Sequence, residues 1–321
     1  MSAVACKLAL PLLSALRQPI RSTGPSSHQA KAGTPTAAGC VFMPLACAVT
    51  CAYIPTTRVM CACGFIMAAS AVGLVDDYFT VNPLSLDRRG LTAQEQLFIQ
   101  TVSGLLLATA APSLMPQHLI STASTGDMAA VSISLTPWIS IAVSPVLYHL
   151  LCVFTYVSEV NAVNLTDGLD GLAATCTALV LSGAGMGLHA SGCQDLQALC
   201  ASLSGAVCGF YMHNRHPAAA FMGNCGSHGL GAAIAAVAAL GGAHGVVGLL
   251  SAVLAVEAGS TAVQLGWFSW TKRRFGEGVR LLRMAPLHHH LEMCGWHEVA
   301  VVAAATAVQA ALVTLVAGMW R

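Results

Sequence analysis

The stretch NAVNLTDGLDGLAATCTALVLSGAGMGLHA, residues 161–190, contains the pattern that decides the fold. Its first part gathers Asn and Asp side chains, and from Leu172 onward the sequence is a continuous apolar run. A membrane barrel strand would alternate apolar and polar residues, whereas a helix that crosses a bilayer needs about 20 mainly apolar residues in succession. The stretch therefore predicts a polar loop followed by a transmembrane helix.

The composition extends this prediction to the whole chain. Of 321 residues, 56% are hydrophobic and only 8% are charged, whereas soluble domains carry about 25% charged residues. We therefore expect an all-α, polytopic membrane bundle, in a single domain over 1–321, with the lipid bilayer as its surroundings. The few, dispersed basic residues argue against nucleic acid as a partner. The thirteen cysteines lie mostly in apolar runs, where they are expected to pack as small hydrophobic side chains.

Nine apolar runs are candidate membrane spans. They cover residues 37–54, 59–75, 97–115, 137–157, 172–190, 196–212, 228–241, 243–268 and 298–320. Residues 1–16 are interrupted by Lys7 and Pro11 and are too short to span, so they predict a stub of a tenth helix.

Five of the connections between spans are rich in polar residues, namely 17–36, 76–96, 158–171, 213–227 and 269–297. Two spans separate each of them from the next, so all five are expected on one face of the membrane. They hold eleven of the fourteen Lys and Arg residues: Arg17, Arg21, Lys31, Arg88, Arg89, Arg215, Lys272, Arg273, Arg274, Arg280 and Arg283. Because positive charge accumulates on the cytoplasmic side, this face is predicted to be cytoplasmic, and the C-terminus to lie outside.

Oxygen-bearing side chains dominate two of these connections. The pair Asp76 and Asp77 ends the motif GLVDDY, and adjacent carboxylates repel unless a cation or water lies between them. The motif NAVNLTDGLDGLA repeats Asn and Asp at spacings of three, which places neighbouring side chains on one helical face. Such oxygen ligands suit magnesium, which usually bridges a substrate phosphate.

Three further connections carry groups suited to anions or protons. The first offers Lys31 within GPSSHQAKAGTPTAAG as a point charge for phosphate. FMGNCGSHGLG, residues 221–231, resembles an anion-binding turn at a helix start. RMAPLHHHLEMCGW presents three consecutive histidines, which point in different directions. One or two of them are therefore expected to face a substrate.

Taken in order, these motifs resemble those of the phospho-N-acetylmuramoyl-pentapeptide transferases over roughly residues 17–297. The resemblance implies ten membrane helices in the bacterial inner membrane, a cytoplasmic active site, magnesium as cofactor, and a homodimer as an open possibility. It also implies the reaction: phospho-MurNAc-pentapeptide passes from UDP-MurNAc-pentapeptide to undecaprenyl phosphate, giving lipid I and UMP. The acceptor phosphate would attack directly or after a covalent aspartyl intermediate.

The resemblance also implies site residues. The catalytic set is Asp76, Asp77, His288, His289 and His290; the substrate-binding set is Lys31, Thr36, Asp170, Asn214, Phe221, Ser227 and Gln264; the metal ligands are Asn164, Asp167 and Asn224.

Three positions depart from the family pattern. Asn224 stands where the family has a magnesium-binding Asp, while Thr80 and Gln96 replace lysines. These losses make a catalytically impaired member of the same fold one alternative. Within the enzyme class, the alternative is a relative that transfers GlcNAc-phosphate, although the PLHHHLE run favours the MurNAc-pentapeptide enzyme. A transporter would explain polar residues at membrane depth, but not five motif loops on one face.

Overall fold

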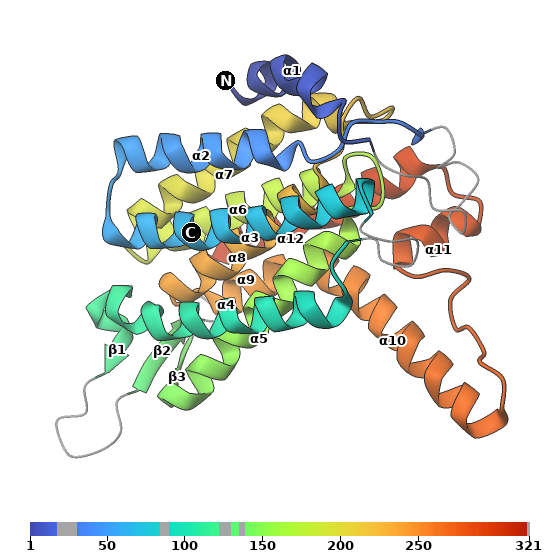
Figure 1. Ribbon diagram of the computed structural model, residues 1–321. Coiled ribbons are helices and arrows are strands. Elements are labelled where there is room, and N and C mark those ends of the chain that lie inside the picture. Colours follow the sequence, from blue (N-terminus) through green and yellow to red (C-terminus); the bar gives the residue numbers. More distant parts are fainter. Residues whose placement is uncertain (18–30, 84–89, 122–129, 135–138, 320–321) are drawn as a thin grey trace.

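The computed structural model describes residues 1–17, 31–83, 90–121, 130–134 and 139–319. Within that part of the chain it confirms a helical membrane bundle (Figure 1). Most of the first polar connection, together with Arg21, Arg88, Arg89 and Arg321, lies outside the described residues. The helices are α1 (Ser2–Leu13), α2 (Gly39–Tyr53), α3 (Thr57–Val81), α4 (Ala93–Leu114), α5 (Pro145–Thr166), α6 (Leu172–Ala190), α7 (Gln194–Asn214), α8 (Gly223–Leu240), α9 (His244–Leu250), α10 (Ala252–Phe275), α11 (Leu287–Met293) and α12 (Glu298–Met319).

Fewer than nine of the described helices are both long enough and apolar enough to be candidate membrane spans. Five described helices (α3, α4, α5, α6 and α12) are long and apolar enough to cross a bilayer, and the bent pair α9 and α10 adds a sixth. Helix α2 is apolar but shorter. The count of nine therefore stays a prediction. Helix α1 is about 18 Å long at 1.5 Å per residue, too short for a bilayer core of about 30 Å.

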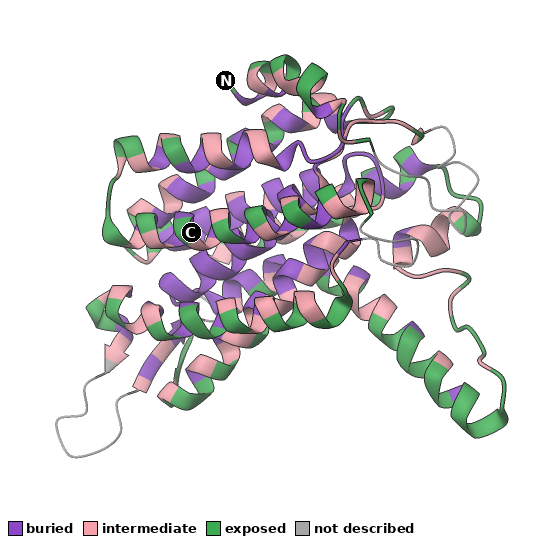
Figure 2. Ribbon diagram, viewed as in Figure 1, coloured by how far each residue is buried: buried purple, intermediate pink, exposed green. Residues whose placement is uncertain are grey.

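Helix α8 forms the centre of the bundle. Every residue from Cys225 to Leu240 is buried (Figure 2). Its sequence is rich in Gly and Ala after Ser227, so neighbouring backbones approach closely, as small residues allow in membrane bundles. A Cβ added at Gly231 would overlap the backbone of Val160 on α5, and one at Gly73 on α3 would overlap the carbonyl of Asn224.

Two predicted spans are wrong in their boundaries. The run 137–157 begins in an antiparallel sheet of β1 (Ile120–Ser121), β2 (Ala130–Ser134) and β3 (Ser140–Val143), and its helix starts only at Pro145. Pro145 occupies the first turn of α5, where its missing N–H costs nothing. The run 243–268 is a broken helix, because α9 and α10 meet at 72° beside Ser251.

Several motif residues lie on helices rather than in loops. Asp76 and Asp77 belong to the last turns of α3, and α5 continues to Thr166 through Asn161 and Asn164. The sequence analysis placed these residues in loops because it ended helices where the apolar run ended. The helix ends that carry the motifs nevertheless gather at one end of the bundle, on the right of Figure 1.

Candidate active site

Asp77 joins α3 to α8. Its Oδ1 accepts the backbone N–H of Asn224 at 2.9 Å, and its Oδ2 accepts that of Cys225 at 3.0 Å. The first N–H groups of a helix have no partner within the helix, and a carboxylate is favourable beside them. Gly223 begins α8 with a positive φ of 68°, which lets the chain turn tightly against this carboxylate. Asp77, only 5% exposed, thus caps α8.

Asp76 faces the same helix start but is bound by side chains. Its Oδ2 accepts Asn224 Nδ2 and, at 3.2 Å, Gln96 Nε2, while its Oδ1 accepts the backbone N–H of Leu91. Both of its oxygens are therefore hydrogen-bonded, and the residue is 4% exposed.

Asn224 links this carboxylate to α5. Its Oδ1 accepts Asn164 Nδ2 at 2.7 Å, and the same Nδ2 donates to Ser227 Oγ at 3.0 Å. Asp76, Asp77, Asn164, Asn224 and Ser227, from three helices, are here named the carboxylate cluster.

Asp167 follows α5 at the edge of this cluster. Among the described residues, neither its carboxylate nor Asn164 Oδ1 has a hydrogen-bond partner. Removal from water raises the pKa of the Asp167 carboxyl to about 7; the charges of Asp77 and Asp170 add to this and that of Lys31 opposes it. The oxygens of these two side chains are those left for a ligand.

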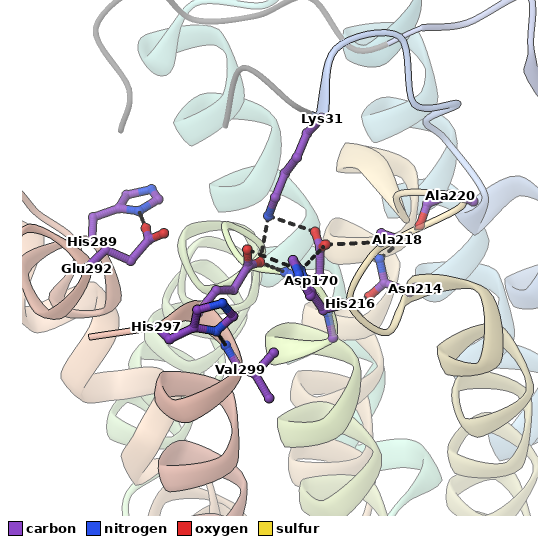
Figure 3. Close-up of polar contacts among 12 residues, drawn as sticks. Lys31, Asp170, Asn214, His216, Ala218, Ala220, His289, Glu292, His297 and Val299 are labelled. Atoms are coloured by element: carbon purple, nitrogen blue, oxygen red, sulfur yellow. Dashed lines mark hydrogen bonds and ion pairs between the residues drawn. The ribbon is translucent and has the colours of Figure 1, made fainter. Parts of the chain in front are cut away.

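A second group, here named the lysine cluster, consists of Lys31, Asp170, His216 and Glu298 (Figure 3). Lys31 Nζ contacts Asp170 Oδ1 at 2.8 Å and Glu298 Oε1 at 2.6 Å. His216 Nδ1 donates to Asp170 Oδ2 at 3.1 Å, and the N–H of Ala218 donates to the same oxygen. Asp170, His216 and Glu298 lie close enough to share one cation, and Lys31 supplies a positive charge there.

Asn214, Thr36 and Phe221 support the lysine cluster. Asn214 accepts the N–H of Gly171 at 3.1 Å and donates to the carbonyl of Ala220 at 2.9 Å, which ties the loop after α5 to the end of α7. The backbone N–H of Phe221 donates to Pro35 at 2.8 Å. The buried Thr36 hydroxyl has no hydrogen-bond partner within the described part of the chain.

The three histidines occupy α11 and point in different directions, as expected for consecutive residues. His288 is fully buried, and its Nδ1 lies 2.9 Å from Glu257 Oε2 on α10. His289 pairs with Glu292 at 2.8 Å. His290 accepts the N–H of Arg283 at 3.1 Å. His288 lies against Gly168 of the motif loop 167–170.

Gln264 lies apart from the other predicted site residues. Its Oε1 accepts the N–H groups of Leu281 and Leu282 at 3.1 and 2.8 Å, so it holds the segment that leads into α11.

Three residues of this region escaped the sequence analysis: His216, Glu257 and Glu298. Glu257 had a usable signal, because a carboxylate within a predicted span is a functional candidate by default. In the sequence, Glu298 is an acidic residue at the start of a predicted span, which is common without a function. Only the fold brings its carboxylate into contact with Lys31 Nζ.

Comparisons with known proteins identify the family of the chain. The model of glycosyl transferase family 4 matches residues 59–242. A phospho-N-acetylmuramoyl-pentapeptide-transferase of Synechococcus sp. (strain JA-2-3B'a(2-13)) is 40% identical over 95% of this chain and 84% of its own length. A protein of the same name from Synechococcus sp. (strain JA-3-3Ab) is 39% identical over 100% of this chain and 89% of its own length. Another from Trichormus variabilis is 37% identical over 94% of this chain and 79% of its own length.

Proposed function

Because this chain belongs to the phospho-N-acetylmuramoyl-pentapeptide transferases within glycosyl transferase family 4, we propose that it performs their reaction at the polar end of the bundle. Phospho-MurNAc-pentapeptide would pass from UDP-MurNAc-pentapeptide to undecaprenyl phosphate, giving lipid I and UMP in peptidoglycan biosynthesis. The motif loops would lie on the cytoplasmic face of the bacterial inner membrane, where the nucleotide substrate is made.

One observation carries the proposal: the charges of Asp77 from one cluster and of Asp170 and Lys31 from the other all act on Asp167, although these residues come from widely separated motifs. Joining two polyanionic substrates requires charge cancellation and alignment for in-line attack. Lys31 offers the positive charge, and the loop 167–170 lies between the two clusters.

The open oxygens fit magnesium. Magnesium binds through one or two carboxylates together with substrate phosphates, and Asp167 and Asn164 offer such ligands. When bound there, the ion would supply positive charge to the substrate diphosphate. Asn224 has a different role in this proposal: its amide bridges Asp76 and Asn164, so its oxygen is already in use.

Asp76 and Asp77 are assigned different roles. Asp77 holds two backbone N–H groups of α8, so it positions Asn224 and Ser227. Asp76 is held by two side-chain amides and one backbone N–H, which a substrate could displace. Asp76 is thus the better candidate to orient or deprotonate the acceptor phosphate. A covalent acyl phosphate on Asp77 would break its cap of α8, which favours direct attack.

The alternative of an impaired enzyme rests on Asn224, because an amide occupies the position of a family carboxylate. The two proposals differ in the effect of Asn224→Asp. An impaired site would gain activity or need less magnesium. A site built on Asp167 and Asn164 would not gain, because the new charge lies beside the diphosphate.

The deciding experiment measures UMP release by the purified protein with undecaprenyl phosphate. UDP-MurNAc-pentapeptide and UDP-GlcNAc are compared as donors, with and without magnesium, in wild type and Asn224→Asp. Release from the first donor alone supports the proposal, and release from UDP-GlcNAc supports the GlcNAc-phosphate relative. No release by wild type, with recovery in Asn224→Asp, supports the impaired enzyme.

A further inference from the structure

Glu257 and His288 form a buried pair between α10 and α11. Glu257 Oε2 lies 2.9 Å from His288 Nδ1 and accepts the backbone N–H of His288 at 3.2 Å. Glu257 is 5% exposed and His288 is 0% exposed. One carboxylate oxygen thus fixes both the start of α11 and the orientation of the ring.

This arrangement determines which ring nitrogen is free. A carboxylate oxygen accepts hydrogen bonds, so Nδ1 of His288 donates to Glu257 and Nε2 is the ring nitrogen left for a further partner. Nε2 is buried and has no hydrogen-bond partner within the described residues. Buried polar atoms normally have partners, so an unpartnered one points to a ligand that completes the site.

The free nitrogen is directed at the motif loop. A Cβ added at Gly168 would overlap His288 Nε2, so the ring lies against the backbone between Asp167 and Asp170. Those two residues belong to the edge of the carboxylate cluster and to the lysine cluster. His289 and His290 are held by Glu292 and by the N–H of Arg283 instead.

We infer that Glu257 is a positioning residue, which holds His288 so that Nε2 accepts a hydrogen bond from a hydroxyl of the bound substrates beside Gly168. The inference rests on the proposed transferase function. Glu257 acts through His288, because its side chain binds both the ring and the backbone N–H of that residue. The same pairing of a carboxylate with the far nitrogen of a histidine fixes the imidazole in other enzymes.

The test is a double-mutant cycle on kcat/KM for UMP release from UDP-MurNAc-pentapeptide. Glu257→Leu and His288→Ala are each expected to lower kcat/KM by about 10–100-fold, the size of effect for the loss of one buried hydrogen bond. The double variant is expected to be no slower than His288→Ala alone, because the two residues act as a unit. Glu257→Gln keeps an oxygen that accepts both bonds, and it is expected to retain most of the activity.

Glu159 provides the matched control, because it is also a buried carboxylate, 7% exposed, on α5. Glu159→Leu is expected to leave kcat/KM near the wild-type value and to show independent, multiplicative effects with His288→Ala. If Glu257→Leu does not accumulate in membranes, Glu257→Ala, which leaves room for water, replaces it in the cycle.

The outcomes separate the inference from the proposed function. If the wild type is active, two results would overturn the positioning role alone. One is that the effects of Glu257→Leu and His288→Ala on kcat/KM multiply in the double variant. The other is that Glu257→Gln is as slow as Glu257→Leu. A wild type that releases no UMP overturns the transferase function, and the inference with it.

Discussion

At the scale of single residues, Asn224 decides how the carboxylate cluster is neutralised. Its Nδ2 donates to Asp76 and its Oδ1 accepts from Asn164, so one side chain links α3, α5 and α8. A carboxylate at this position would have no proton to donate to Asp76. Two facing carboxylates require a cation or a shared proton. The neutral amide therefore performs structurally what a cation would perform between two acids.

This reading predicts that Asn224→Asp makes the stability of the protein depend on magnesium. Without magnesium, the thermal unfolding midpoint in detergent should fall below that of wild type, because the new carboxylate repels Asp76. Added magnesium should restore it, while wild type without substrate should change little. Asn161→Asp is the control, since Asn161 bonds Gln100 and the carbonyl of Val157 rather than a carboxylate. An equal response to magnesium in both variants would contradict the bridging role.

A second residue-scale prediction concerns the cap of α8. Asp77→Ala removes the acceptor of two helix N–H groups and should cost about 0.5–2 kcal/mol of stability, as for other helix caps. Thr56→Ala removes the cap of α3 at the opposite end of the bundle and should cost a similar amount. Only Asp77→Ala should abolish UMP release, because only α8 carries Asn224. Comparable activity in the two variants would remove Asp77 from the site.

At the scale of elements, glycines set the distances between α8 and its neighbours. Gly39 on α2 approaches Gly226, Gly73 on α3 approaches Asn224, and Gly231 approaches Val160 on α5. Dispersion contacts and close backbone packing hold membrane helices together, because lipid removes the hydrophobic drive between them. These approaches also place the first turn of α8 against the end of α3, where the carboxylate cluster forms.

Two glycines of α3 allow a matched test of this packing. Gly73→Ala should destabilise the fold by about 1–3 kcal/mol, as overpacking does elsewhere, and should lower activity by displacing Asn224. Gly64→Ala, on the same helix, meets no atom within 4 Å and should be neutral or slightly stabilising. The measurements are thermal unfolding in detergent and UMP release. Equal effects of the two substitutions would show that helix propensity, not contact, governs this face.

At the scale of the whole molecule, one end of the helical bundle carries the polar motifs and the opposite end carries few polar residues. The polar end bears the two clusters and α11, whereas the opposite end bears the short turns after α2 and α6 and the small sheet (Figure 1). Most Lys and Arg residues of the sequence belong to the connections at the polar end, so the positive-inside rule predicts that this end faces the cytoplasm.

Labelling from the two sides of the membrane checks this orientation. Cysteines introduced by Asn82→Cys and Glu277→Cys, in a background with the native cysteines replaced, should react with an impermeant maleimide only in inverted vesicles. Ala190→Cys, at the other end of α6, should react only in right-side-out vesicles. All three positions are exposed, so access rather than burial determines the result. Labelling of Asn82→Cys and Glu277→Cys from different sides of the membrane would contradict a site shared by their two connections.

The sequence by itself determined the membrane bundle and the grouping of its motifs. Continuous apolar runs specify helices in lipid, and an even number of spans between polar connections places those connections on one side. Local chemistry also marked Asp76, Asn164 and Asp170, because carboxylates and amides beside apolar runs are costly without a function.

Tertiary structure alone decided the contacts among these residues. Asp77 caps α8, Glu298 contacts Lys31, and Glu257 orients His288, each across more than 30 positions of sequence. No local pattern encodes such pairs, because they depend on how closely the glycine-lined helices approach. For the same reason the sequence could not place the break between α9 and α10. Nor could it show that Asn224 donates to Asp76, which leaves the side-chain oxygens of Asp167 and Asn164 without a partner among the described residues.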